Sequence, residues 1–303
     1  MKKLASLFLF AFGFIAPASY GAEKINVVTT TTDLASLTRE VGGDRVDVTS
    51  LAKGYQDPHF VDPKPSYLTL LRNADLFEVV GLELELGWLP PLLDQSRNPK
   101  IRPGGSGYLD ASQGVEILDR PTGAVNRSMG DIHASGNPHY WLEPGNAIRI
   151  AIQISQRLSQ IRPGDAPYFA ARLQSFKVRM NDANKRWTAA LAPYRGAKIV
   201  TYHRSWPNFV RRYGLNVVGY VEPKPGVPPS PSHTFELINL MKAQKVKVIL
   251  VEPFFDLKTP SSIAERTGAK VLVMYPSVGG TPAVDDYFKL FDRNVAELVN
   301  ALR

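Results

Sequence analysis

The sequence contains no cysteine, and this absence excludes several kinds of chemistry together. Disulfide scaffolds, cysteine zinc sites, iron–sulfur clusters and thiol nucleophiles all depend on sulfur. A metal ion would therefore have to be held by histidine, aspartate or glutamate. Histidine is itself scarce, with 5 in 303 residues, so each one can be weighed separately.

Long hydrophobic runs are absent after the first residues of the chain. Leu4–Ala18 is almost wholly apolar, and nothing after it approaches the roughly 20 apolar residues that a membrane-spanning helix needs. The hydrophobic content of 44% is nevertheless too high for a disordered chain. With 303 residues the chain is long enough for two domains of ordinary size.

The first 21 residues have the pattern of a secretory signal peptide. A basic start at Met1–Lys3 precedes the apolar run, and Ser19–Gly21 supplies the small–x–small pattern of a cleavage site. A membrane anchor is the alternative, although the run is short for one. No cysteine follows the run, which excludes a lipid-anchored cysteine. We expect residues 1–21 to be removed and the mature chain to be exported to the periplasm without a lipid anchor.

Positive charge is in excess but is not concentrated. The net charge of +8 falls to +6 when Lys2 and Lys3 leave with the signal peptide. The densest remaining spots, Arg211-Arg212 and Lys245–Lys247, are pairs rather than tracts. Nucleic-acid binding requires a clustered basic face or stacking aromatic residues. We therefore expect an ordinary solvated surface and no nucleic-acid partner.

Short β-branched segments alternate with helical patterns along the chain. Ile25–Thr30 and Val46–Leu51 are typical of buried strands, and Asp33 can cap a helix between them that ends at Gly42-Gly43. A helix at Tyr67–Arg72 and a strand at Leu76–Gly81 continue the alternation. This order predicts an α/β fold with mostly parallel sheets.

The same strand–turn–helix pattern returns in the second half. Val27–Gly42 can be laid on Ile199–Gly214, although few residues are identical. Further strands are predicted in this half, at Val217–Val221, Val246–Val251 and Lys270–Met274. We therefore predict two α/β lobes of similar construction, the second starting near Gly196.

A long helix is predicted between the two lobes. Apolar residues recur there at three- and four-residue steps, at Phe169, Leu173, Phe176, Met180, Trp187 and Leu191. Residues 165–189 would span roughly 37 Å as a helix. The helix could lie within one lobe, but its position favours a link between them. The predicted divisions are a first lobe at 22–164, a linking helix at 165–192 and a second lobe at 193–303.

Three of the five histidines occupy positions that suit metal binding. His59 and His139 each follow a polar residue and a proline, which presents the imidazole from a stiff turn. His203 follows a buried strand, at the end where α/β sheets place their ligand sites. Each could singly be a structural histidine. Together they fit a tetrahedral Zn²⁺ site with one position left for a carboxylate or water, and nitrogen ligands favour zinc over Mn²⁺.

Eight short segments share their order and spacing with a known family. They are Asp57–His59, Gly81–Glu85 before Trp88, Asn137–Pro144, Tyr202-His203, Glu222–Gly226, Pro229–His233, Val251–Pro253 and Ala264–Lys270. Over nearly all of the mature length, the chain resembles the metal-binding proteins of bacterial ABC transporters for zinc and manganese, the ZnuA/TroA-like periplasmic components.

The resemblance implies two α/β lobes joined by a rigid helix, with metal held in the cleft between them. His59 and His139 would come from the first lobe and His203 from the second. An inner-membrane ABC permease would receive the metal, and a periplasmic metallochaperone is a further possible partner. We expect the chain to act as a monomer.

The sequence departs from the family pattern at the fourth ligand. The family usually supplies an Asp after a late strand of the second lobe, where this chain reads Met274–Ser277. Glu252, which ends a predicted strand, is our first candidate for the missing ligand, and its alternative role is to orient a histidine ring from behind. Asp285 and Asp286 are weaker candidates, and water is another.

The remaining polar residues near these segments receive weaker assignments. His133 lies in a polar, Gly-bearing loop, where a metal-collecting role is a hypothesis only. His233 starts a predicted helix and is interpreted as structural. Glu222 and the prolines after it predict a rigid loop near the cleft, with no chemical role that we can assign.

The leading hypothesis is a non-enzymatic binder of a divalent transition metal, Zn²⁺ first, with Mn²⁺ or Fe²⁺ tolerable if the fourth ligand is a carboxylate. A zinc hydrolase using Glu252 or Asp57 as general base is the alternative, but the chain has no His-Glu-x-x-His or Gly-x-Ser-x-Gly motif. A binder of sugars or amino acids and a surface adhesin are also considered. Metal-dependent turnover of a model substrate would favour the hydrolase, and stabilisation by an organic solute would favour the binder of sugars or amino acids.

Overall fold

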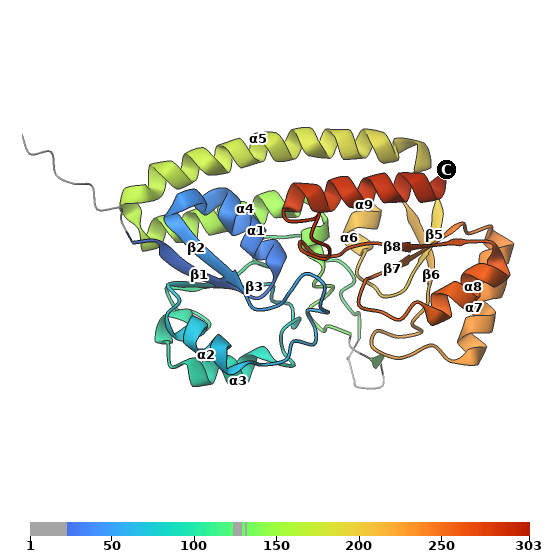
Figure 1. Ribbon diagram of the computed structural model, residues 1–303, viewed down its shortest axis with the longest axis horizontal. Helices are drawn as coiled ribbons and strands as arrows, with labels where there is room; N and C mark the ends of the chain where they lie inside the picture. The colour runs from blue at the N-terminus through green and yellow to red at the C-terminus, as the bar shows by residue number, and fades with distance from the viewer. Residues whose placement is uncertain (1–22, 124–128, 131) are drawn as a thin grey trace, which may run out of the picture.

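The computed structural model describes residues 23–123, 129–130 and 132–303. These residues form two α/β lobes, each built on a four-stranded sheet (Figure 1). The expected signal peptide, residues 1–21, lies outside the described residues. Within the part that is described, no helix is both long and apolar enough to cross a bilayer.

The sheet of the first lobe has the strand order β2-β1-β3-β4, and all neighbouring strands run parallel. Helices connect successive strands, as the alternating sequence pattern predicts. The elements of this lobe are β1 (Ile25–Thr29), α1 (Thr32–Gly42), β2 (Val46–Ser50), α2 (Pro65–Arg72), β3 (Leu76–Val79), α3 (Leu89–Ser96), β4 (Tyr108–Asp110) and α4 (Pro144–Ile161).

The second lobe repeats this topology with the order β6-β5-β7-β8, again all parallel. In each lobe the first strand lies between the second and the third, so β1 and β5 are equivalent. This bears out the predicted similarity of the lobes. Its elements are β5 (Lys198–Thr201), α6 (Pro207–Tyr213), β6 (Asn216–Tyr220), α7 (Pro231–Gln244), β7 (Val248–Val251), α8 (Lys258–Thr267), β8 (Lys270–Val273) and α9 (Tyr287–Leu302).

A single helix, α5 (Ala166–Leu191), runs along both lobes and has 26 residues (Figure 1). The predicted apolar stripe of α5 faces the hydrophobic core. Phe169, Phe176, Met180 and Trp187 are buried, and Leu173 is partly buried. The largest apolar core extends from Ile25 of the first sheet through α5 to the second lobe. The lobes therefore share one packed interior instead of meeting at a flexible hinge.

The segment after β8 is fastened to the first lobe by polar contacts. The indole N–H of Trp141 donates to the carbonyl of Pro276 at 2.8 Å, and the backbone N–H of Val278 donates to Asp33 Oδ1 at 3.0 Å. The N–H of Tyr287, the first residue of α9, donates to Ser36 Oγ at 3.0 Å. Helix α9 then returns beside α5 (Figure 1). These contacts add to the shared core in holding the lobes together.

Candidate metal centre

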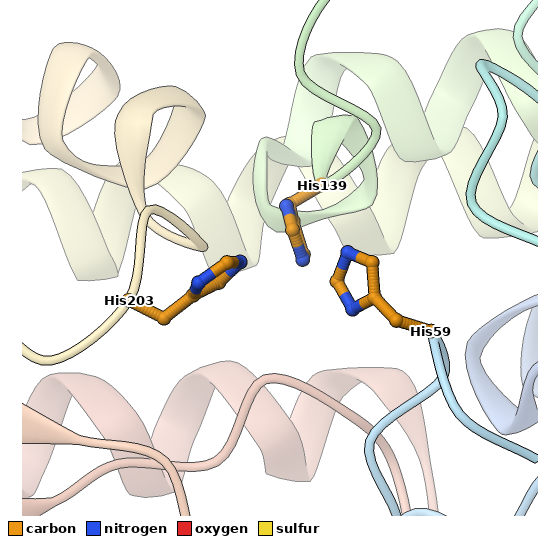
Figure 2. A group of neighbouring side chains, drawn as sticks. All are labelled: His59, His139 and His203. Carbon is orange, nitrogen blue, oxygen red and sulfur yellow. The ribbon is translucent and has the colours of Figure 1, made fainter. Parts of the chain in front are cut away.

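Three histidine side chains from separate segments converge between the lobes. His59 lies in the loop between β2 and α2, His139 directly precedes a short 3₁₀ helix, and His203 follows β5 by two residues. One ring nitrogen from each lies within 4.8 Å of the others, and the rings point toward one another in Figure 2. The ring centroid of His59 lies 5.2 Å from that of His139 and 5.5 Å from that of His203.

Each of these rings is held at Nδ1 by an oxygen atom. His59 Nδ1 lies 2.7 Å from Asp57 Oδ1, and His139 Nδ1 lies 3.1 Å from Asn137 Oδ1. His203 Nδ1 lies 2.8 Å from Glu222 Oε2. Carboxylate and amide oxygens accept hydrogen bonds, so each Nδ1 carries the proton and each Nε2 keeps its lone pair. This tautomer is the one that a metal ligand bound through Nε2 requires.

The polar–Pro–His pattern itself builds two of these arrangements. In each, the side-chain oxygen two residues earlier also accepts the backbone N–H of the histidine, at 3.0 Å in both turns. The amide of Asn137 is oriented by a second contact, because its N–H₂ group donates to the carbonyl of Arg204 at 2.8 Å. Its oxygen must therefore face His139. This contact also ties the His139 turn to the second lobe beside His203.

Glu222 is the partner of the third ring, and the sequence did not reveal that role. It lies just after β6, and its side chain is buried. Its Oε2 accepts from the backbone N–H of Gly226 at 3.4 Å as well as facing His203. The predicted rigid loop thus holds a carboxylate against an imidazole from the neighbouring strand end. Neighbouring parallel strands place their carboxyl ends together, which was the one signal available for this contact.

The electrostatics differ from one imidazole to the next. Burial lowers the pKa of His139 well below its usual value, and the nearby His59 and His203 rings lower it further. Burial alone would lower the pKa of His203, but the hydrogen bond with Glu222 and the charges of Glu252 and Glu222 outweigh it and raise the pKa. Burial would raise the pKa of Asp57, yet its contacts with His59 lower it. Asp57 is therefore ionised beside the site.

A cavity of about 310 Å³ is lined by two of the three rings, His139 and His203, and by His133. Pro138, Arg204 and Pro225 are among the residues that line it from both lobes. His59 Nε2 is buried and has no hydrogen-bond partner in the structure. An unpaired buried nitrogen is costly unless something binds it. The centroids of the three rings form a nearly equilateral triangle, with sides of 5.2, 5.5 and 5.6 Å, so a cation among them would be reached by all three.

Comparison with known proteins shows the family to which the chain belongs. The family model described as "Zinc-uptake complex component A periplasmic" matches residues 27–301. The chain belongs to this family. It is 26% identical over 310 residues to the zinc-binding protein AdcA of Streptococcus pyogenes serotype M3, covering 98% of this chain and 60% of the relative. The chain thus spans about 60% of the length of this relative.

Two further members of the family match over nearly their whole length. The high-affinity zinc uptake system protein ZnuA of Bacillus subtilis is 24% identical over 320 residues, which covers 99% of this chain and 98% of the relative. A crystal structure of ZnuA superposes with a TM-score of 0.77 at 25% identity, over 93% of this chain and 100% of that one. The family and the two-lobe fold expected from the resemblance are both confirmed. The predicted lobe boundaries remain predictions.

The segment Met274–Ser277, where the resemblance led us to expect a fourth ligand, serves the contact between the lobes. Of the four residues Met274–Ser277, all but Tyr275 are buried, and the carbonyl of Pro276 accepts from the indole N–H of Trp141 at 2.8 Å. None carries a carboxylate. The weaker candidates are occupied elsewhere: Asp285 pairs with Lys289 at 2.6 Å, and Asp286 caps α9.

Glu252 lies directly after β7 and is completely buried. Its Oε1 accepts from the indole N–H of Trp206 at 2.9 Å, whereas Oε2 has no partner. Neither of its carboxylate oxygens belongs to the group of ligand atoms that lie within 4.8 Å of one another, which contains only nitrogens of His59, His139 and His203. Burial raises the pKa of Glu252, against the opposing charge of His203. It therefore lies near His203 without joining the three rings.

The two other histidines differ sharply in their surroundings. His233 Nε2 lies 2.9 Å from the carbonyl of Tyr220, at the start of α7, which agrees with a structural role. The ring of His133 lies beside that of His59, with 5.2 Å between centroids. Burial, together with His59 and His203, lowers the pKa of His133 to about 4. His133 is thus neutral and faces the metal centre.

Proposed function

We propose that this chain captures a divalent transition metal, Zn²⁺ first, between its lobes and delivers it to an ABC permease for import. His59, His139 and His203 are the proposed ligands. The observation that carries the proposal is that all three rings are fixed at Nδ1 by oxygen acceptors and converge on one place. The family membership and the zinc-uptake role named for the Bacillus subtilis relative support it.

The oxygens behind the rings balance the charge of the cation. Asp57 and Glu222 each hold a ring from behind, so two carboxylates lie one hydrogen bond away from the proposed ligands. Such partners raise the basicity of a metal-bound imidazole and fix its orientation. We infer that Glu252 acts in a similar way, through its charge on His203, rather than as a ligand. This is the second of the two roles that the sequence left open for it.

The metal preference follows from the donor set. Three neutral imidazoles favour Zn²⁺, whereas Mn²⁺ and Fe²⁺ prefer sites with more oxygen. Nitrogens about 2.0–2.1 Å from a tetrahedral zinc lie about 3.4 Å from one another. The three nitrogens, within 4.8 Å of each other, need only a small contraction to reach this arrangement. We therefore propose a largely preformed zinc site.

A non-enzymatic role is also part of the proposal. The two carboxylates considered as the general base of a hydrolase are both occupied: Asp57 faces His59, and Glu252 accepts from Trp206. The comparisons offer no support for a hydrolase. Capture would release protons from protonated imidazoles, and the occupied lobes would present the metal to the permease. A periplasmic metallochaperone is a proposed additional partner, and the chain is proposed to act as a monomer.

The direct test is the metal content and affinity of the mature chain. Protein purified without added metal is analysed for its elements, and Zn²⁺, Mn²⁺ and Fe²⁺ are each titrated against a competing chelator. We expect one zinc per chain and a clear preference for zinc over the other two. Equal or tighter binding of Mn²⁺ would contradict the zinc assignment. Absence of any metal binding, together with stabilisation by a sugar or an amino acid, would overturn the function.

A further inference from the structure

His133 lies beside the three proposed ligands, although the sequence assigned it only a weak collecting role. Its ring centroid is 5.2 Å from that of His59, the same separation as between His59 and His139. Imidazoles bound through nitrogen to one tetrahedral zinc have centroids about 5 Å apart, given a metal–nitrogen distance of about 2.0–2.1 Å. The spacing of His133 from His59 therefore matches that of two ligands on the same ion, although the ring of His133 does not yet lie within 4.8 Å of all three proposed ligand nitrogens.

The nitrogen that would bind is free. His133 Nε2 is buried and has no hydrogen-bond partner in the structure, as is His59 Nε2. The His133 ring also interacts with the backbone of Leu82. This contact raises the pKa of His133, as a hydrogen bond from the ring to a carbonyl does, but burial outweighs it. A proton donated from Nδ1 to that carbonyl leaves the lone pair on Nε2. The unpaired Nε2 is the atom that His133 offers to a metal.

A strained turn of the first lobe holds this histidine in place. Gly81, Leu82 and Glu83, which follow β3, all have positive φ, at 77°, 51° and 68°. Such a conformation is costly for leucine and glutamate and commonly marks a functional site. The turn aims the carboxylate of Glu83 at the residues after His133. Its Oε2 accepts from the N–H of Ala134 at 2.8 Å, and its Oε1 from the hydroxyl of Ser135 at 3.0 Å.

The loop that bears His133 also reaches the second lobe. Gly130 has a φ of 79°, and a Cβ there would lie 2.3 Å from the carbonyl oxygen of Pro225. Only glycine permits so close an approach. The loop is therefore held by Glu83 on one side and packed against the second lobe on the other. His133 is presented over the metal centre by contacts to both lobes.

We propose that His133 supplies the fourth ligand of the bound metal through Nε2, in place of the carboxylate that is missing after β8. The proposal rests on the metal-binding function argued above. In the present arrangement His133 lies outside the three nitrogens within 4.8 Å of one another, so binding draws its ring inward. Four imidazoles make an all-nitrogen site, which selects zinc against Mn²⁺ more strongly than a site with a carboxylate. Glu83 acts as the positioning residue.

The test counts the imidazoles on the metal. The mature chain and its His133→Ala variant are loaded with zinc alone, and X-ray absorption spectra are fitted for the number of histidine ligands. His233→Ala is the matched control, because that histidine binds the carbonyl of Tyr220 instead of facing the site. We expect four imidazoles in the unaltered chain and in His233→Ala, and three in His133→Ala. An unchanged count in His133→Ala would overturn the proposal.

Zinc and manganese titrations of the same variants supply a second readout. His133→Ala should weaken zinc binding at least about tenfold and reduce the preference for zinc over Mn²⁺. Glu83→Gln, which keeps the ring but weakens its support, should produce a smaller loss with the imidazole count still four. If His133→Ala binds zinc as tightly as His233→Ala, His133 is not a ligand.

A His139→Ala variant separates this proposal from the function on which it depends. If His139→Ala loses zinc while His133→Ala does not, the metal site stands and only the fourth-ligand assignment fails. If neither variant affects zinc binding, the proposed function fails with it. Thermal unfolding of each metal-free variant establishes that losses of affinity do not come from a damaged fold.

Discussion

Glu222 Oε2 lies 2.8 Å from Nδ1 of His203, although 19 residues separate the two in the chain. The contact joins the segments that follow two neighbouring parallel strands, β5 and β6. A carboxylate placed behind an imidazole fixes the proton on Nδ1 and strengthens the binding of metal at Nε2. The same relationship recurs at His59 with Asp57, which indicates a common construction for the site.

Removal of the charge of Glu222 should therefore weaken metal binding without removing a ligand. We expect Glu222→Gln to lower zinc affinity by about 10- to 100-fold. A competitive titration with a zinc chelator measures this loss. Glu236→Gln is a suitable control, because Glu236 is exposed on α7. If the two variants bind zinc equally, Glu222 does not support the site.

Zinc affinity should depend on pH chiefly through His203. Its pKa is raised above 6.5 because Glu222 and Glu252 outweigh the effect of burial, whereas burial and neighbouring rings keep His139 neutral. As the pH falls through the raised pKa of His203, a proton occupies this ring first and competes with the metal. We expect zinc affinity to fall with acidification from above pH 6.5, and Glu222→Gln to move this fall to lower pH. Titrations at several pH values measure it, and a loss that begins well below pH 6 in the unaltered chain would contradict it.

A buried carboxyl in the first lobe should make the stability of the fold depend on pH. Burial raises the pKa of Glu78 from 4.5 to about 8. The hydroxyl of Thr38 lies 2.6 Å from Glu78 Oε2 and 2.8 Å from the carbonyl of Leu34, but it has only one proton to donate. Protonated Glu78 resolves this conflict by donating to Thr38, which then donates to Leu34.

The sign of the effect follows from the two pKa values. The unfolded chain loses this proton near pH 4.5 and the folded chain near pH 8, so the folded state loses stability as the pH rises between them. Glu78→Gln keeps a donor for Thr38 and cannot ionise. We expect ionisation of Glu78 to lower the free energy of unfolding of the unaltered chain by about 3 kcal/mol between pH 5 and pH 8, and Glu78→Gln to lack this loss. Urea unfolding of both chains at both pH values measures this loss. If the free energy of unfolding changes equally with pH in the unaltered chain and in Glu78→Gln, Glu78 does not have this role.

Metal binding should change the overall shape very little. The apolar core is continuous from the first sheet through α5 to the second lobe, and Trp141 and Asp33 bond the segment after β8 to the first lobe. A packed interface of this kind favours small local shifts over hinge closure. We expect the radius of gyration from X-ray scattering to change by no more than about 0.5 Å on zinc loading. A contraction of several ångströms would show that the lobes close as hinged bodies.

Much of the fold and part of the site could be predicted from the residues alone. The β-branched segments around Val27 and Ile199 indicated equivalent strands, and the apolar stripe of α5 indicated the long helix within two residues at its end. The polar–Pro–His turns already contain the acceptors for His59 and His139. The strands, the helix and the stiff turns are local features, so the period of the apolar residues and the turn chemistry were enough to find them. The acceptor roles of Asp57 and Asn137 were not predicted, although both residues lie within the turns.

The contacts that were missed all join residues far apart in the sequence. The pairing of Glu222 with His203 depends on how β5 and β6 lie in the sheet, and the position of His133 depends on the left-handed turn at Leu82-Glu83. The sequence favoured Glu252 for the fourth position because it ends a strand, but the indole of Trp206 occupies one of its oxygens. Neither spacing nor composition carries information on such long-range partners.

The central claim, that the converging histidines bind zinc, is tested most directly by a zinc titration of His139→Ala beside the unaltered mature chain. His139 is buried, and its ring centroid lies 5.2 Å from that of His59 and 5.6 Å from that of His203. Its loss should therefore weaken zinc binding by about a thousandfold or more, while thermal unfolding of the metal-free protein stays within a few degrees. We predict that the unaltered chain binds one zinc and that His139→Ala loses this binding. Zinc binding of unchanged affinity in His139→Ala would contradict the account.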